Sequence, residues 1–149
     1  DLVTMDFGAV CGGYHSDITR TICVGHADAR QRDVYNAVLA AQQRALAALR
    51  PGVTGIKVDR IARDVLAEYD LEQYFGHGLG HSLGLEIHEE PRLSKAGTTV
   101  LEENMLITDE PGVYIPGWGG IRIEDTVLIT ADGAEALTHA PKEFIEICI

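Results

Sequence analysis

Four acidic residues lie in short apolar stretches that have the composition of β-strands. They are Asp6, Asp17, Glu110 and Glu124. A buried carboxylate without a partner is costly, and several close together repel one another. Divalent cations turn this repulsion into attraction, because carboxylate oxygens are good ligands for them. The alternative is that each acid lies at an exposed strand edge or pairs with a basic neighbour such as Arg20 or Arg122.

The two pairs of acids have a similar setting in the sequence. Asp17 follows Gly13 by four residues, and Glu124 follows Gly120 by four. A Gly-Gly pair is typical of a turn, so each pair of acids is expected on the two strands of one hairpin. Two such hairpins that face each other would bring four carboxylates together. The two short matches also raise internal duplication as a hypothesis.

A histidine cluster lies between these stretches, in the glycine-rich segment 76–91. It contains His77, His81 and His88. His77 and His81 have the i, i+4 spacing of a helical zinc site, but glycines disfavour a helix and the HExxH motif requires glutamate where Gly78 stands. The glycines also miss the GxGxxG spacing of a phosphate-binding loop. They instead allow the backbone to pass close to a site at which the imidazoles are presented.

The elements that must position these residues are strands and helices in separate blocks. A hairpin is predicted over residues 2–25, helices over 28–50 and 54–69, and strands over 104–110 and 121–130, followed by a short terminal strand. The segment 76–84 is expected to be irregular or extended. This layout predicts the α+β class. The apolar helix positions are Val34, Val38, Ala41, Ala45 and Leu49 in the first helix, and Ile56, Ile61 and Val65 in the second.

Composition limits the classes of function. The chain has 149 residues, 46% of them hydrophobic, which suits one domain or a large part of one. A net charge of −11 disfavours nucleic acid, whose phosphates would be repelled. No apolar run approaches the roughly 18 residues of a membrane span. The three cysteines lack CxxC spacing, which disfavours a disulfide framework or zinc-thiolate site and favours a reducing cytoplasm.

The chain resembles the pita-bread metallopeptidases, a family that includes methionine aminopeptidase, aminopeptidase P and prolidase. The matching stretches are DFGAVCGGYHSDITRT, HGLGHSLGLEIHEEP, LEENMLITDEPGVY and PGWGGIRIEDT. The HEEP stretch and the short interval from Glu110 to Glu124 resemble the proline-specific branch. The resemblance implies that residues 1–149 are the metal-binding, C-terminal part of one pita-bread catalytic domain that lacks its N-terminal segment. Asn104 departs from the family, which often has glycine there.

The resemblance also implies a ligand set and a reaction. Two divalent ions, Mn²⁺ or Co²⁺ with Zn²⁺ as an alternative, would be held by Asp6, Asp17, His81, Glu110 and Glu124. A water that bridges the ions would attack the Xaa-Pro bond of dipeptides or short peptides with proline at position 2. Glu110 would act as general acid–base, and His88 and His77 would donate hydrogen bonds to the substrate or oxyanion. The expected substrate-binding residues are His77, His88, Arg92 and Arg122.

Other functions remain open at this stage. The same fold serves in inactive scaffold or binding proteins that have lost their metals, and in creatinase, a hydrolase that works without metal. The presence of all five expected ligands favours an active metallopeptidase. Arg92 resembles the prolidase residue that binds the C-terminal carboxylate of a dipeptide, although an ion pair with Glu89 or Glu90 is the simpler reading. A homodimer is a further expectation, and a membrane partner is not expected.

Overall fold

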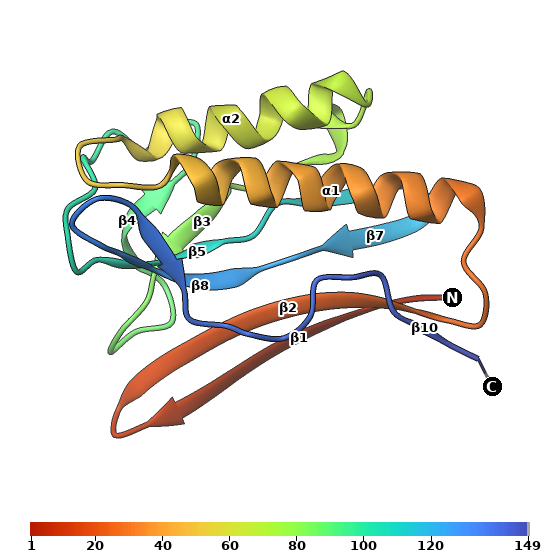
Figure 1. Ribbon diagram of the computed structural model, residues 1–149, viewed down its shortest axis with the longest axis horizontal. Coiled ribbons are helices and arrows are strands. Elements are labelled where there is room, and N and C mark those ends of the chain that lie inside the picture. Colours follow the sequence, from red (N-terminus) through yellow and green to blue (C-terminus); the bar gives the residue numbers. More distant parts are fainter. Residues whose placement is uncertain (149) are drawn as a thin grey trace.

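The computed structural model describes residues 1–148 and has the predicted α+β architecture. Two helices lie on one side of the central strands, and a long hairpin lies on the other side (Figure 1). The helices are α1 (Ala29–Ala48), α2 (Gly55–Glu68) and the short 3-10 helix η1 (Glu72–Tyr74). The strands are β1 (Leu2–Cys11), β2 (Tyr14–Val24), β3 (Gly80–Ser82), β4 (Glu89–Leu93), β5 (Leu106–Asp109), β6 (Gly112–Ile115), β7 (Gly119–Arg122), β8 (Asp125–Ile129), β9 (Ala134–Ala136) and β10 (Glu146–Ile147).

The strands form three sheets. One has the order β1-β2-β10, the second β4-β3-β5-β8-β9, and the third is the pair β6-β7. The β1–β2 hairpin is the one predicted around Gly12-Gly13. The predicted strand over 121–130 is divided between β7 and β8, so the second hairpin consists of the β5–β8 ladder continued by the β6–β7 ladder.

The first helix follows its sequence pattern closely. Asp28 accepts a hydrogen bond from the backbone N–H of Gln31, and the Gln31 side chain accepts one from the Asp28 N–H, which forms a capping box. All five predicted apolar positions of α1 and its C-terminal flank are buried in the main core. The core extends from α1 and α2 to the strands behind them, with Ile107, Ile121, Ile123, Val127 and Ile129 fully enclosed.

The second helix begins after Thr54 as predicted, but its buried face differs from the prediction. Ile56 is 40% exposed and Ile61 is half-buried, whereas Val58, Ala62 and Leu66 are fully buried beside Val65. The stripe at 58, 62, 65 and 66 has the i, i+4, i+7, i+8 spacing of one helix face. It was obscured in the sequence because two charged residues on α2 are also buried.

Strands β4 and β6 were not predicted. Strand β4 lies at the edge of its sheet, where Pro91 is tolerated because its missing N–H faces no ladder partner. Strand β6 follows Glu110 and Pro111 directly and reads as part of a loop in the sequence. Among residues 1–148, no helix combines the length and apolar character that a membrane span requires.

Candidate metal centre

Strand register determines where the four acids lie. In the first hairpin Asp6 pairs with Thr19, and Asp17 pairs with Gly8. The two aspartates are therefore diagonal neighbours on one face. In the second hairpin the register runs from Asp109↔Asp125 to Gly112↔Arg122, which places Glu110 directly opposite Glu124 at the break between the two ladders.

The two hairpins face each other, as the sequence predicted. The backbone N–H of Glu124 donates to the Thr19 carbonyl at 3.0 Å, and the Thr126 hydroxyl donates to the Asp17 carbonyl at 2.7 Å. Strand β3 carries His81 and lies beside β5, on the side away from β8. A side chain at Gly80 would overlap the Thr108 carbonyl, with its Cβ only 1.9 Å from that oxygen. Glycine is therefore required there for the close approach that brings His81 to the acids.

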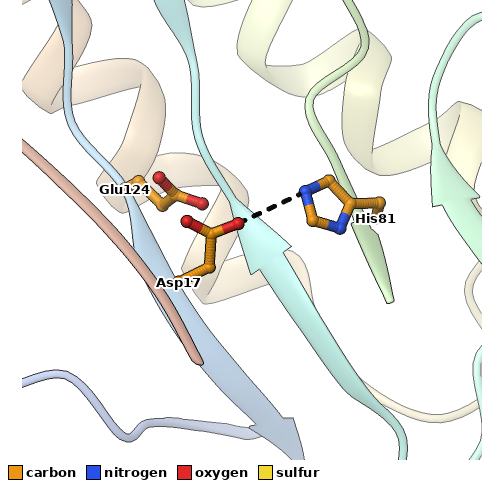
Figure 2. Close-up of side chains that lie close together, drawn as sticks. All are labelled: Asp17, His81 and Glu124. Atoms are coloured by element: carbon orange, nitrogen blue, oxygen red, sulfur yellow. Dashed lines mark ion pairs between the residues drawn. The ribbon is translucent and has the colours of Figure 1, made fainter. Parts of the chain in front are cut away.

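Three of the expected ligands form a tight group. Asp17, His81 and Glu124 each offer one ligand atom, and these atoms all lie within 4.8 Å of one another. Figure 2 shows the two carboxylates side by side, with the His81 ring pointing toward Asp17. The Nε2 atom of His81 is 3.7 Å from Asp17 Oδ2 and 3.2 Å from Glu110 Oε1. Its Nδ1–H donates to the Ser82 carbonyl, so Nε2 is the nitrogen that faces the acids. The protonated ring donates from Nε2 to Glu110, and the neutral ring offers the Nε2 lone pair to a metal ion.

Burial and like charges perturb this group strongly. Burial, with the charge of Glu110 next, raises the pKa of Glu124 to about 8. Burial, with the charges of Asp6 and Glu110, also raises the pKa of Asp17. Burial favours protonation of Glu110 too, but hydrogen bonds with His81 and Thr108 outweigh it and hold its pKa below the ordinary value. Glu124 Oε1 is buried and has no hydrogen-bond partner among the described residues.

Hydroxyl groups and one arginine complete the group. Sequence reasoning missed the hydroxyls of Thr108 and Tyr114. The Thr108 hydroxyl donates to Glu110 at 2.9 Å, and Thr19 donates to Glu124 at 2.5 Å. Arg122 forms an ion pair with Asp6 and donates to the Tyr114 hydroxyl at 2.7 Å. The predicted alternative for Asp6 is thus realised, but as part of the cluster. The unnoticed signal was spacing, because Thr108 in β5 is two residues before Glu110, which directly follows the strand, and extended backbone places both side chains on one face.

The expected substrate residues border the same acids. A cleft of about 370 Å³ is lined by Asp6, His77, Gly78, Gly80, His81, His88, Arg92, Ser94, Glu110 and Arg122. The rings of His81 and His88 meet edge to face at 4.4 Å. Arg92 is half exposed and lies 3.5 Å from Glu90, the ion pair anticipated as the simpler reading. All nine predicted site residues therefore lie in or beside one cleft.

The hydrogen bonds of His77 limit what its ring can do. Its Nδ1 lies 2.8 Å from the Gly78 carbonyl, which only accepts, so Nδ1 carries the proton. Its Nε2 is buried and has no partner within residues 1–148. The neutral ring therefore presents an acceptor at Nε2, and it can donate there only as an imidazolium. This differs from the donor role expected from the sequence.

Comparison with known proteins covers nearly the whole chain. The Xaa-Pro dipeptidase of Pyrococcus furiosus is 54% identical over 145 residues, which are 97% of this chain and 42% of that protein. The structure of a prolidase from Pyrococcus furiosus has a TM-score of 0.93 at 55% identity, over 95% of this chain and 42% of that one. The structure of an X-Pro aminopeptidase from Thermotoga maritima has a TM-score of 0.95 at 41% identity, over 99% and 41%.

These similarities confirm the predicted resemblance and the pita-bread fold. The chain spans about two fifths of the length of the relatives it matches. The family model of metallopeptidase family M24 matches residues 1–131. This range includes both hairpins, α1, α2 and the acidic cluster, which consists of Asp6, Asp17, Glu110 and Glu124. The chain therefore belongs to metallopeptidase family M24.

Proposed function

We propose that Asp6, Asp17, His81, Glu110 and Glu124 bind two divalent metal ions. The observation that carries this proposal is the buried Glu124 carboxylate, which has an oxygen without a partner among the described residues and lies beside Asp17 and His81. Several carboxylates and an imidazole lone pair form a donor set that suits divalent cations. Four carboxylates and one imidazole favour Mn²⁺ or Co²⁺, with Zn²⁺ also compatible.

The reaction we infer is hydrolysis of the Xaa-Pro bond at the N-terminus of dipeptides or short peptides. Two bound ions would supply an activated water and polarise the scissile carbonyl. The pKa of Glu110 lies below the ordinary value, so its carboxylate is ionised near neutral pH and has a free site that can accept a proton. Thr108 and His81 fix the orientation of its carboxylate.

The basic residues of the cleft are proposed to bind the peptide. His88 lines the cleft against His81 and would contact the substrate. His77 Nε2 suits acceptance of a substrate N–H in the neutral ring, or stabilisation of an oxyanion as an imidazolium. Arg122 is held between Asp6 and Tyr114 at the rim and would face the peptide backbone.

Proline specificity rests on the relatives. The similar proteins of Pyrococcus furiosus and Thermotoga maritima are an Xaa-Pro dipeptidase and an X-Pro aminopeptidase, and we infer the same preference for this chain. A scaffold protein without activity and a creatinase-like metal-free hydrolase are the alternatives. Both are disfavoured by the retention of five clustered ligand candidates. A cytoplasmic location fits the three free cysteines, Cys11, Cys23 and Cys148.

The deciding experiment combines metal analysis with a substrate pair. Full-length protein is expected to contain two equivalents of Mn²⁺ or Co²⁺ after reconstitution and to cleave Xaa-Pro but not Xaa-Ala peptides. Equal cleavage of both peptides would remove proline specificity. Active protein without bound metal would support the creatinase-like alternative, and metal-free inactive protein would support a scaffold.

Arg92 is expected to separate dipeptidase from aminopeptidase activity. Its exposed ion pair with Glu90 is weak, so the guanidinium can exchange that partner for the C-terminal carboxylate of a Xaa-Pro dipeptide. Arg92→Ala should then raise KM for dipeptides several-fold, and longer Xaa-Pro peptides should change little. Arg60→Ala, which alters an exposed arginine on α2, is the matched control. Equal effects on both substrates, or no effect on either, would favour an aminopeptidase.

Metal uptake is expected to weaken as the pH falls below about 8. Burial, with the charge of Glu110, raises the pKa of Glu124 to about 8 in the metal-free protein, so this ligand must lose a proton to bind an ion. The apparent affinity for Mn²⁺ should fall by up to about tenfold per pH unit below that value and level off above it. Calorimetric titration in buffers of different ionisation enthalpy measures the affinity and the released proton.

The same raised pKa affects the stability of the metal-free protein. The folded state binds the Glu124 proton more tightly than the unfolded chain does, so stability should decrease as the pH rises from the ordinary value of 4.5 to about 8. Thermal unfolding across this range measures the effect. A Mn²⁺ affinity and a metal-free stability that are both independent of pH would contradict the assignment of Glu124.

A further inference from the structure

Helix α2 contains a buried ion pair that the proposed mechanism does not use. Arg63 Nε lies 2.8 Å from Asp59 Oδ2, and Nη2 lies 3.2 Å from Oδ1. Their side chains are 3% and 1% exposed. The free-energy cost of removing two charges from water is offset only when further hydrogen bonds satisfy their remaining donors and acceptors. The residues that supply these further hydrogen bonds are the part of the chain that the ion pair keeps in place.

The remaining hydrogen bonds of the pair all reach one short segment. Arg63 donates to the carbonyls of Phe75 at 2.9 Å and His77 at 2.5 Å, and Asp59 accepts from the Leu79 N–H at 3.0 Å. Three alternate residues are thus anchored, and the two residues between them are glycines. Glycine gives the backbone wide conformational freedom, so without the anchors this segment would sample many conformations. The ion pair removes that freedom.

The side chains of the segment are stacked on the same pair. The Arg63 guanidinium lies over the Phe75 ring at 4.2 Å, and the Phe75 ring meets the His77 ring edge to face at 4.9 Å. The His77 Nδ1–H donates to the Gly78 carbonyl inside the anchored segment. Both the backbone and the ring of His77 are therefore fixed from α2, while His77 itself lines the cleft beside the acids.

We propose that Asp59 and Arg63 are positioning residues that hold segment 75–79 and thereby orient the His77 ring in the cleft. The inference rests on the proposed function only for the role of His77 in turnover. Among the described residues, the pair contacts none of the cleft acids, and His77 is the one proposed substrate-binding residue that it contacts, so it acts through His77.

The helix offers a matched control for this pair. Arg60 and Asp64 have the same residue types with the same i, i+4 spacing on α2, at 2.7 Å, but their side chains are 66% and 54% exposed. An exposed pair of this kind contributes little to stability. Arg60→Lys therefore repeats the chemical change of Arg63→Lys at a position that anchors no segment.

The test compares these substitutions in the full-length, metal-loaded protein. Lysine at 63 keeps a charge for Asp59 but lacks the planar fork that reaches two carbonyls. Arg63→Lys should lower kcat by about tenfold with little change in KM or metal content, and Arg60→Lys should change neither. In a His77→Ala background, the fold-loss of kcat caused by Arg63→Lys should be at least about threefold smaller, because both substitutions act on the His77 ring. Fully additive losses of kcat would overturn the proposal.

A second readout does not depend on activity. In ¹⁵N-labelled protein, solvent exchange of the His77 Nδ1 proton should be at least about tenfold faster in Arg63→Lys than in Arg60→Lys. Unchanged exchange would overturn the proposal even if the protein proves inactive, whereas faster exchange in an inactive protein would reject only the proposed function. If Arg63→Lys does not fold, the double variant D59L/R63M, which removes both charges, takes its place in the proton-exchange measurement. If neither variant folds, the pair is a determinant of the fold, and the positioning role is overturned.

Discussion

Removal of divalent ions with a chelator is expected to lower the turnover of Xaa-Pro peptides by about 10³-fold or more. Bound ions contribute several kcal/mol to stabilisation of developing charge, and each factor of ten in rate corresponds to about 1.4 kcal/mol. Among the described residues, Asp17, His81 and Glu124 each bring one ligand atom to the same place, and no protein group donates a hydrogen bond to Glu124 Oε1. Addition of Mn²⁺ or Co²⁺ should restore activity.

A substitution tests the same site without a chelator. His81→Ala removes the Nε2 lone pair that faces Asp17 and Glu110, and it should lower both metal content and turnover. His139→Ala, at an exposed histidine outside the cleft, should change neither. Full-length protein that stays active after exhaustive chelation, with no metal by elemental analysis, would rule out the two-ion site.

Replacement of Glu110 with glutamine is expected to lower kcat by about 10²-fold or more while the fold is retained. Glutamine preserves the size of the side chain and one oxygen, but it cannot accept a proton. The hydrogen bond from Thr108 can still reach that oxygen, so little structural change is expected. Steady-state kinetics with a Xaa-Pro dipeptide, together with circular dichroism and metal analysis, measures the three quantities.

Glu103 provides the control for this substitution. It is exposed, lies shortly before β5, and is not one of the residues that line the cleft. Glu103→Gln should leave kcat unchanged. Near-normal turnover in Glu110→Gln would exclude Glu110 as the base. If Glu110→Gln loses metal content to the same extent as kcat, Glu110 acts only as a metal ligand.

Local pattern was sufficient for much of the fold. The Gly12-Gly13 turn, the start of the first helix near Asp28 and the apolar spacing of α1 are each determined by neighbouring residues, and all appear in the structure. Asn104, at which the chain departs from the glycine that the family often has, adopts a positive φ of 70°, which asparagine tolerates better than most residues. The acidic pairs could also be found, because strand alternation and the turns place them on defined faces.

Other features depend on contacts that sequence spacing does not contain. The buried face of α2 includes Asp59 and Arg63, which look like surface charges until their partners in segment 75–79 are known. Strand β4 contains a proline and becomes a strand only as the outer neighbour of β3. The proton position on His77 follows from a carbonyl within 2.8 Å, which no residue pattern predicts.

The joint between the two hairpins has a consequence for folding. Each hairpin can pair locally, but the contacts between Thr19 and Glu124 and between Asp17 and Thr126 join parts of the chain more than 100 residues apart. Contacts between residues so far apart in the sequence form late, because the entropy cost of closing a long loop must be met before the contacts can stabilise the chain. The acidic cluster is therefore expected to assemble in the last cooperative step. Ions that bind only the assembled cluster should slow unfolding more than they speed folding, so metal occupancy would govern the kinetic lifetime of the native protein.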